Sequence, residues 1–232
     1  MSNQSAAKAP ALRLEAIVKT FPGVRALDGV SFDVMPGEVH ALMGENGAGK
    51  STLMKVLGGI HQPDSGRIIV NEIPVKMGSP LEAKHKGIVF IHQELSLAKE
   101  LTVAENIYLG ELPRQRFGLV DWQALFDKTN KILQRLKVGF DARTQVGDLS
   151  IANQQMVEIA RALTHEAKAV IFDEPTASLT DAEKVVLFEV VEDLKSHGVG
   201  IIYISHRMEE IFKITDRISV LRDGQYRGTL ET

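Results

Sequence analysis

The stretch MGENGAGKST, Met43 to Thr52, crowds three glycines and an alanine around one lysine that precedes two hydroxyl residues. An apolar run, VHAL, comes directly before it, and apolar residues at helical spacing follow it. Glycine adopts positive φ without strain, so backbone amides in such a segment can turn inward toward an anion. A helix that starts at the lysine would add its N-terminal amides and its positive dipole end. The stretch therefore predicts a phosphate-binding loop between a strand and a helix.

The residues of this loop match the pattern G-x-x-x-x-G-K-[ST], in which glycine-rich backbone surrounds the phosphates of a nucleotide. In that arrangement the ammonium group of Lys50 reaches the outer phosphates, and the hydroxyl of Ser51 ligates Mg²⁺. A glycine-rich turn that arose by chance is the alternative, and average residue frequencies give such a match in about one chain of this length in a hundred. We therefore expect a nucleotide site at Gly44, Glu45, Asn46, Gly47, Ala48, Gly49, Lys50, Ser51 and Thr52.

Composition narrows the class of protein around this loop. The chain has 232 residues, 44% of them apolar and 25% charged, which is typical of one large globular domain or a core with an insertion. The net charge of −3 gives no overall basic field for nucleic acid, and the absence of cysteine excludes disulfides and thiolate metal sites. We expect no signal peptide at the polar N-terminus, and no apolar run approaches the roughly 20 residues of a membrane helix.

Strands and helices are expected to alternate on both sides of the loop. Apolar alternation or short apolar runs predict strands at 12–21, 30–34, 36–44 after a turn, 66–72, 87–93, 169–174 and 200–206. Helical spacing predicts helices at 50–60, 150–163, 181–198 and 207–214, and a hairpin turns at Asp223–Gly224 within 217–230. This alternation predicts an α/β fold with a largely parallel sheet covered by helices.

The segment from about residue 95 to 148 differs in character from the rest. Strand runs are absent from it, and DWQALFDKTNKILQRLKV, 121–138, shows helical spacing, so we expect a mostly helical insertion there. The core domain is then expected at 11–94 and 149–232. Residues 1–10 are small and polar, and we expect them to be disordered.

Polar residues follow three of the predicted strands. Asp173 and Glu174 end the apolar run AVIF, and carboxylates in such a place are costly unless a cation lies beside them. With Mg²⁺ at the phosphate loop, Asp173 would hold the metal and Glu174 would orient or deprotonate the attacking water. Gln93 would ligate Mg²⁺ or place the water, and His206 would contact the γ-phosphate, because ligands gather at the carboxyl ends of parallel strands. Solvated acids and ordinary loop or capping residues are the alternatives.

In their order along the chain, these motifs resemble those of the ATP-binding cassette (ABC) ATPases. The order is the phosphate loop, Gln93, LSIANQQMVEIARAL, VIFDEP and His206, and the match covers about residues 12–230. The segments IHQELSLAKELTVAENIYLG and LSIANQQMVEIARAL look like those of bacterial monosaccharide importers. The resemblance implies a P-loop NTPase fold, with a RecA-like, mostly parallel sheet that has helices on both faces. It also implies an N-terminal antiparallel β subdomain and an inserted α-helical subdomain at about 95–148.

The resemblance assigns further residues to nucleotide contacts. Phe21 matches the aromatic position that stacks on adenine, for which a core or edge phenylalanine is the alternative. Ser150 matches the signature serine, which in this family contacts the γ-phosphate of ATP held by an opposite cassette. Most members have the signature LSGGQ, whereas this chain has Leu149, Ser150, Ile151, Ala152 and Asn153, followed by Gln154.

Two departures from the family pattern affect the ATP site of the partner cassette. Ile151 and Ala152 replace glycines, and their side chains would hinder close backbone approach to phosphate, although Ser150 and the helix N-terminus keep their attraction for an anion. Thr180, followed by Asp181, stands where the family usually has aspartate. Neither departure changes a residue of this chain's own phosphate loop.

The resemblance implies an ATPase that uses ATP and Mg²⁺ to power import of a monosaccharide, with Glu174, His206, Gln93 and Lys50 as its catalytic residues and Ser51, Gln93 and Asp173 as metal ligands. Two cassettes, fused in one polypeptide or paired as a dimer, would close on ATP. The insertion near 94–111 would carry that motion to membrane-spanning permease subunits at the cytoplasmic face of the bacterial inner membrane, and a periplasmic sugar-binding protein would act indirectly.

Two other classes of function remain open from the sequence. A soluble cassette ATPase that acts on ribosomes or DNA is disfavoured by the net charge of −3 and the short insertion, and we expect no nucleic-acid partner. A cassette that binds ATP mainly for regulation is compatible with the altered signature, although the presence of Glu174 and His206 favours catalysis in this chain's own half of the site.

Overall fold

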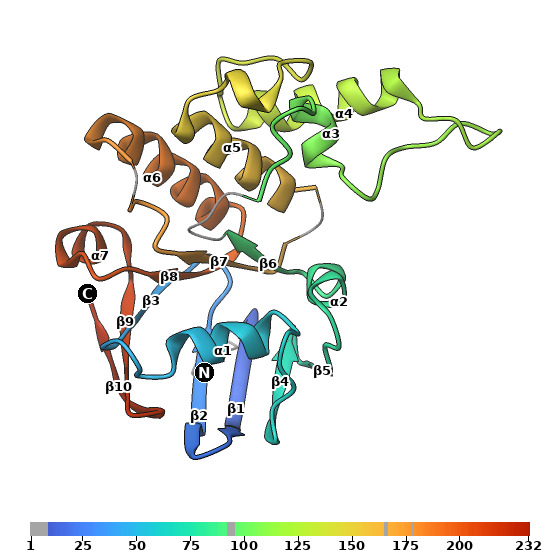
Figure 1. Cartoon of the computed structure of the whole chain (residues 1–232). Coiled ribbons are helices and arrows are strands. Elements are labelled where there is room, and N and C mark those ends of the chain that lie inside the picture. Colours follow the sequence, from blue (N-terminus) through green and yellow to red (C-terminus); the bar gives the residue numbers. More distant parts are fainter. Residues whose placement is uncertain (1–8, 92–95, 165–166, 178) are drawn as a thin grey trace, which may run out of the picture. The chain divides into compact units, whose positions relative to one another are not determined.

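The computed structural model describes residues 9–91, 96–164, 167–177 and 179–232, in two compact units (Figure 1). The first unit comprises Met1–Phe90, Ala167–Glu174 and Val191–Thr232, and the second comprises Ile91–Glu166 and Pro175–Val190. Gln93 lies outside the described residues. So do residues 1–8, which belong to the segment 1–10 that was expected to be disordered.

An antiparallel sheet of four strands belongs to the first unit. Its strand order is β2-β1-β4-β5, with bounds β1 (Leu12–Phe21), β2 (Val24–Val34), β4 (Ser65–Val70) and β5 (Ile73–Val75). Pro22 and Gly23 join β1 to β2, and Gly23 has a φ of 81°, as the second central residue of a Pro-Gly turn requires. This sheet confirms the predicted N-terminal antiparallel subdomain.

A second sheet of six strands is mostly parallel. Its strand order is β10-β9-β3-β8-β7-β6, with bounds β3 (Val39–Met43), β6 (Ile88–Ile91), β7 (Ala169–Asp173), β8 (Gly200–Ile204), β9 (Arg217–Arg222) and β10 (Gln225–Glu231). β9 pairs in parallel with β3, β3 with β8, and β8 with β7, while β10 runs antiparallel at the edge after the expected Asp223–Gly224 turn. The predicted largely parallel α/β sheet is therefore confirmed.

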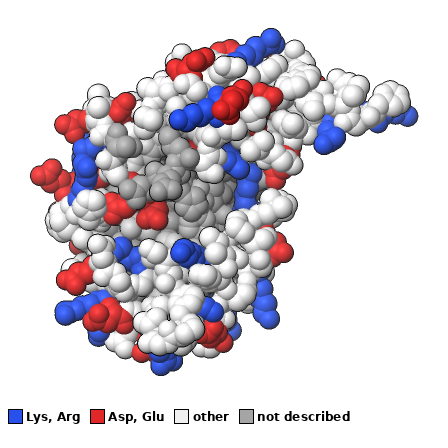
Figure 2. All heavy atoms as spheres, viewed as in Figure 1, with Lys and Arg blue, Asp and Glu red and all other residues white. Residues whose placement is uncertain are grey.

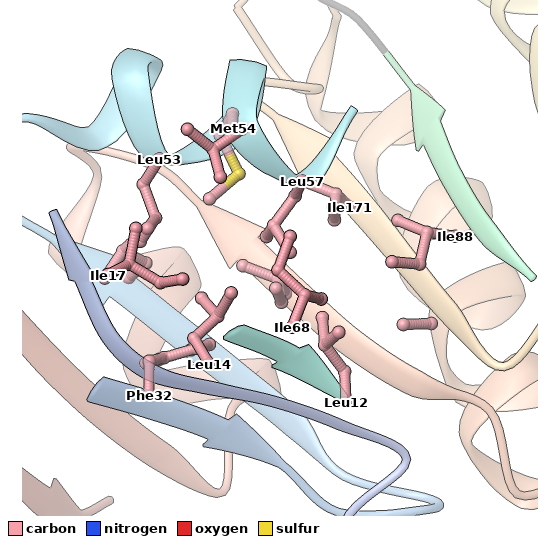
Figure 3. Close-up of a cluster of buried hydrophobic side chains, with 14 of the residues drawn as sticks. Leu12, Leu14, Ile17, Phe32, Leu53, Met54, Leu57, Ile68, Ile88 and Ile171 are labelled. Atoms are coloured by element: carbon pink, nitrogen blue, oxygen red, sulfur yellow. The ribbon is translucent and has the colours of Figure 1, made fainter. Parts of the chain in front are cut away.

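Helix α1 (Lys50–Leu57) packs between these two sheets. Its Leu53 and Leu57 are fully buried, and Figure 3 shows them among strand residues of both sheets, including Leu14 of β1 and Ile171 of β7. Burial of one such leucine stabilises the fold by about 1.5–3 kcal/mol. The helix that begins at the end of the phosphate loop is therefore fixed along its length by the core of the unit.

The other face of the six-stranded sheet is also covered by a helix. Along β3, Leu42 points into the cluster around α1, whereas Ala41 packs on the opposite side against Ile211 of helix α7 (Met208–Ile214). Successive strand residues point to opposite faces, so this alternation shows that both faces of the strand are buried by helices. The implied arrangement, with helices on both faces of the sheet, is confirmed.

Three elements differ from the expectation. Strand β5 was not predicted, because Asn71 and Glu72, both with positive φ, turn the chain back within the segment that was expected to be one strand and its end. Strand β2 begins at Val24 instead of residue 30, because Gly29, with a φ of 69°, and register shifts in the pairing with β1 interrupt the apolar alternation on which the prediction relied. The structure also contains helix α2 (Pro80–His85), which was not expected. Its start signals are visible in the sequence, since Ser79 accepts a hydrogen bond from the Glu82 amide and proline occupies the first position.

Helices dominate the second unit. They are α3 (Val103–Ile107), α4 (Trp122–Arg135), the 3₁₀ turn η1 (Val146–Asp148), α5 (Ile151–Ala162) and the part of α6 (Asp181–Ser196) up to Val190. α4 lies within the helix predicted at 121–138, and the side chain of Asp121 caps it by accepting a hydrogen bond from the Ala124 amide. Within the described ranges, every helix is too short or too polar to traverse a bilayer.

A buried histidine lies between the two sheets of the first unit. His40 of β3 is 1% exposed, and its Nδ1 lies 2.8 Å from the carbonyl oxygen of Asp33, which can only accept a hydrogen bond. Nδ1 therefore carries the proton, and Nε2 accepts from the Ser219 hydroxyl at 2.8 Å. Burial lowers the pKa of His40 below 6.5, and the nearby Arg217 lowers it further, although the Glu38 carboxylate opposes this.

We expect this histidine to make stability depend on pH. Below pH about 6.5 the unfolded chain protonates His40 while the folded chain does not, so the free energy of unfolding should fall as pH drops from there, by at most about 1.4 kcal/mol per pH unit for this proton. Urea denaturation at a series of pH values measures the slope. His40→Asn, which keeps an N–H donor for Asp33, should flatten it, whereas the same change at the exposed His197 should not. An unchanged slope in His40→Asn would contradict the assignment.

Candidate nucleotide-binding site

The residues predicted to bind nucleotide follow neighbouring strands of the six-stranded sheet, at the carboxyl ends of those strands. β3, β8 and β7 are neighbours and parallel, and the register places Ala41 of β3 and Phe172 of β7 both opposite Tyr203 of β8. The segments that leave these strands therefore start at a similar level. They carry the phosphate loop after β3, His206 after β8, and Asp173 with Glu174 at the end of β7. In open α/β sheets this is the edge at which ligands bind.

The phosphate loop turns sharply between β3 and α1. Gly47 and Gly49 have φ values of 86° and 105°, in the region that glycine tolerates without strain, and Gly49 directly precedes the first turn of α1. The ammonium group of Lys50 donates hydrogen bonds to the carbonyl oxygens of Gly44 at 2.5 Å and Glu45 at 3.1 Å. The lysine charge and the N-terminal amides of α1 are thus held at the same loop, as anion binding requires.

Close packing behind the loop explains two of its glycines. A Cβ atom on Gly44 would lie 2.3 Å from the carbonyl oxygen of Leu221, and one on Gly49 would lie 2.7 Å from the carbonyl oxygen of Ala26. Both contacts are with backbone, which cannot rotate away. The side chains are therefore excluded at these positions by the shape of the unit as well as by the needs of a bound anion.

The turn between β9 and β10 forms a backbone hydrogen bond with the phosphate loop. The amide of Gly224 donates to the carbonyl of Ala48 at 3.0 Å, and the carbonyl of Gly224 accepts from the amide of Asp28 at 2.8 Å. The sequence identified this turn through its Asp-Gly pair, but it gave no signal that the turn would contact residues far away in the chain. Gly224 therefore links the phosphate loop to β2.

Glu174 and His206 form a pair at the same edge. Glu174 has a φ of 50°, which is uncommon for a residue with a Cβ atom, and its amide donates to the carbonyl of Ile204 at 2.9 Å. Its Oε2 lies 2.8 Å from Nδ1 of His206. The Glu174 side chain is 22% exposed, and that of His206 is 74% exposed. A carboxylate oriented in this way, open to water on one side, can accept a proton or position a water molecule.

The oxygen atoms available here fit a magnesium ion that is coordinated partly by the protein and partly by phosphate. Ser51 is exposed in the first turn of α1, and Asp173 is half-buried as the last residue of β7. Hydroxyl and carboxylate oxygens are ligands that Mg²⁺ accepts, usually with several phosphate or water oxygens. Within the described residues, no group of three or more His, Cys, Asp or Glu side chains could hold a metal.

Phe21 lies at the tip of the β1–β2 hairpin, whose strand β2 contacts the phosphate loop. It pairs with Val24, and the carbonyl of Ala26, two residues further along β2, lies against Gly49. At a strand rise of about 3.3 Å per residue, the aromatic residue is roughly 7 Å along the hairpin from that contact. The ring of His61 meets the Phe21 ring edge-on, with centroids 5.2 Å apart. The spacing suits an aromatic contact with the base of a nucleotide.

The segment predicted to contact a partner's nucleotide belongs to the second unit. Ser150 is the N-cap of α5, and its hydroxyl accepts a hydrogen bond from the amide of Asn153 at 3.3 Å. Gln154 donates from its side-chain amide to the carbonyl of Leu149 at 2.9 Å. Ile151, which replaces a glycine of the usual signature, is 51% exposed. The side chain therefore projects from the start of the helix, beside the serine.

The other departure, Thr180, has a structural role. Its amide donates to a carboxylate oxygen of Glu183 at 2.8 Å, and its hydroxyl accepts from the Glu183 amide at 3.4 Å, the reciprocal pattern of a capping box at the start of α6. The hydrogen bond from the Thr180 amide lowers the pKa of Glu183. Ser150, Asn153 and Glu183 all line a pocket of about 120 Å³ in this unit.

Residues 27–177 match the family described as ABC transporter. A protein of Burkholderia cenocepacia (strain HI2424) that is named as a ribose/galactose/methyl galactoside import ATP-binding protein is 53% identical over 222 residues, which are 95% of this chain and 43% of that protein. A similarly named protein of Rhizobium meliloti (strain 1021) is 51% identical over 218 residues, 94% of this chain and 42% of that protein. The chain thus spans less than half the length of these relatives.

A solved structure agrees with the fold at nearly full length. The ADP conformation of an ATP-binding cassette of an ABC transporter matches with a TM-score of 0.83 and 34% sequence identity, and the match covers 97% of this chain and 92% of that one. The similarity therefore extends over both units of the chain.

Proposed function

This chain belongs to the ABC transporter family, and on that premise we propose that it binds and hydrolyses ATP with Mg²⁺ to power the import of a monosaccharide. One observation carries the proposal. The phosphate loop, Asp173 and the Glu174–His206 pair follow three adjacent parallel strands of a single sheet. The relatives with about half of their aligned residues identical are named for ribose and galactose import, which supports the class of sugar.

The chemistry follows from the groups at this edge. Lys50 would exchange its carbonyl partners in the loop for the outer phosphates, while the loop amides hold the remaining oxygens. Glu174 would orient or deprotonate the attacking water, and His206, which the carboxylate holds in place, would contact the γ-phosphate. Phe21 would stack on the base. Ser51 and Asp173, together with Gln93, would hold Mg²⁺, which neutralises phosphate charge when bound.

The partners belong to the proposal as well. A second cassette, in the same polypeptide or in a dimer, would face the phosphate loop with its own signature helix, and this chain's Ser150 would contact the nucleotide of that partner. Membrane-spanning permease subunits would receive the motion at the cytoplasmic face of the membrane. A periplasmic sugar-binding protein would deliver the sugar to those subunits, so this chain would not touch it.

The distribution of charge disfavours a nucleic-acid partner. Figure 2 shows one face of the molecule, on which positive and negative side chains are interspersed among the described residues and form no continuous basic patch. Proteins that bind the phosphate backbone usually gather lysine and arginine on one face. This face therefore gives no support to a cassette ATPase that acts on ribosomes or DNA.

A binding experiment tests the ATPase proposal directly. The purified chain is expected to bind Mg²⁺-ATP at least about tenfold more tightly than AMP, because the outer phosphates add charge-assisted hydrogen bonds to Lys50 and the loop. Isothermal titration calorimetry measures both affinities. Equal affinity for ATP and AMP would contradict the phosphate-loop assignment.

The transport part needs its own test. When the full-length protein is co-expressed with the permease encoded beside it, we expect the two to co-purify from membranes, and ATP hydrolysis to rise when a sugar-loaded binding protein is added. Co-purification with RNA and not with membrane subunits would favour the soluble alternative.

A further inference from the structure

Asp64 joins the strand that carries Phe21 to the segment that follows α1. Its Oδ2 accepts a hydrogen bond from the Thr20 amide at 2.7 Å, and its Oδ1 accepts from the Lys19 ammonium group at 2.8 Å. Its own amide donates to the carbonyl of Val18 at 2.8 Å. One aspartate thus contacts three consecutive residues directly before Phe21.

These contacts replace strand pairing where it stops. β4 pairs with β1 only as far as Val18, which faces Ser65. Beyond that point, within the described part of the chain, Thr20 and Phe21 have strand partners only on the β2 side. A two-stranded hairpin tip is only marginally stable in water. The Asp64 carboxylate supplies the missing acceptor for the Thr20 amide and fixes the backbone one residue away from the aromatic ring.

The segment that carries Asp64 is itself anchored to α1. The amides of Ile60 and His61 both donate to the carbonyl of Lys55, at 2.9 and 3.0 Å, in the last turn of the helix. The ring of His61 then meets Phe21 edge-on, and the Lys19 ammonium group lies 5.6 Å from the centroid of the same ring. A short chain of contacts therefore runs from the phosphate-binding helix to the aromatic ring.

We propose that Asp64 is a positioning residue that holds Phe21 at a fixed distance from the phosphate loop, and so sets the affinity for the base of the nucleotide. This inference rests on the proposed ATP binding. The triphosphate would bind at the start of α1, and the hydrogen bonds of Asp64 connect the segment after the end of that helix to the hairpin tip. Without these hydrogen bonds the Phe21 ring is no longer held at a fixed distance from the phosphates, while the phosphate loop keeps its contacts with Gly224 and Leu221.

The hydrogen bonds to the Asp64 carboxylate form at neutral pH and contribute little to the free energy of unfolding. The hydrogen bond from Lys19, followed by that from the Thr20 amide, lowers the pKa of Asp64, so the carboxylate is ionised under ordinary conditions. The side chain of Asp64 is 43% exposed, and ion pairs in such settings contribute little to folding. Substitutions at Asp64 should therefore leave a folded protein in which the affinity for nucleotide can be measured.

The test compares a ligand that has a base with one that does not. Asp64→Ala is expected to weaken Mg²⁺-ATP binding about five- to tenfold, a part of the stacking contribution, and to leave the affinity for Mg²⁺-tripolyphosphate within about twofold. Glu15→Ala is the matched control, because Glu15 is a carboxylate of β1 that forms an ion pair with Arg67 of β4 but lies farther from the hairpin tip than Asp64. That control should change neither affinity.

Two further variants separate positioning from a general structural effect. Asp64→Asn keeps an acceptor for the Thr20 amide and should restore ATP affinity to within about twofold of the original, because the ion pair to Lys19 contributes little. In a background that already carries Phe21→Ala, Asp64→Ala should cause no further loss, since the ring that it positions is gone.

The outcomes discriminate clearly. Equal losses for ATP and tripolyphosphate, or an additive loss in the Phe21→Ala background, would overturn the positioning role. Unchanged ATP affinity in Asp64→Ala would do the same while leaving the proposed function intact. Failure of the unsubstituted chain to bind ATP would instead remove the proposed function itself. If Asp64→Ala did not fold, Asp64→Asn would still test the role, because a loss of ATP affinity well beyond twofold in this variant, which keeps an acceptor for the Thr20 amide, would overturn it.

Discussion

Lys50→Ala is expected to lower the affinity for Mg²⁺-ATP at least about a hundredfold, because two or more charge-assisted hydrogen bonds to phosphate are lost, each contributing about 1.5–3 kcal/mol. Among the described residues, Lys50 donates to the carbonyls of Gly44 and Glu45, in a loop whose residues 45–47 are exposed. Water can replace those bonds, so the melting temperature should change little. Calorimetric titration with ATP, beside a thermal melt, measures both quantities.

Lys55→Ala is the matched control for this prediction. Lys55 lies in the last turn of the same helix and its side chain is exposed, so its removal takes away one positive charge without touching the loop. ATP affinity should stay within about twofold, since exposed charges this far along the surface are screened by salt. If Lys50→Ala and Lys55→Ala had the same small effect, the loop would not be the phosphate site.

The parts of the fold that the sequence predicted well are those whose signals are local. The phosphate loop is specified by Gly44, Gly49 and Lys50 within a single short stretch, and the strand before it is a continuous apolar run. Burial on both faces explains that run, because Ala41 and Leu42 pack against different helices. The position of Asp173 at a strand end followed from the same reasoning, and the sheet order places β7 two strands from β3, so that Asp173 lies at the same end of the sheet as the loop.

The parts that the sequence did not predict depend on contacts between distant residues. Nothing near Gly224 indicates that its amide would meet Ala48, and nothing near Asp64 indicates a bond to Thr20. Both contacts arise only when two sheets close around α1. The Asp223–Gly224 pair was legible as a turn, but a turn signal does not name the residues that the turn will contact.

Thr180 illustrates a third case, in which a departure from a family pattern has a local physical reason. Together with Glu183 it forms a capping box, so the residue that replaces aspartate starts helix α6. Ile151, in contrast, exposes its side chain at the start of α5. Of the two departures, the one at Ile151 is therefore the better candidate for an effect on a partner's nucleotide.

Glu174→Gln is expected to retain ATP binding and to lose steady-state hydrolysis. Glutamine has nearly the same shape as glutamate and can keep a hydrogen bond to His206, so the positive φ and the bond from the Glu174 amide to Ile204 should persist. The amide, however, cannot accept a proton from water. General-base catalysis contributes about 10²- to 10⁴-fold, so kcat should fall by that factor while ATP affinity stays within about threefold.

The same substitution at Glu192 is the control for this prediction, because that residue is exposed on helix α6 and has no assigned part in catalysis. Both variants should be measured under conditions in which the unsubstituted protein turns over ATP, with binding followed separately by calorimetry. A loss of binding in Glu174→Gln would mean that the strained backbone after β7, and not the carboxylate, had been disturbed. Full turnover in that variant would remove Glu174 from the mechanism, and the water would then have to be positioned by another group at the same end of the sheet, such as His206.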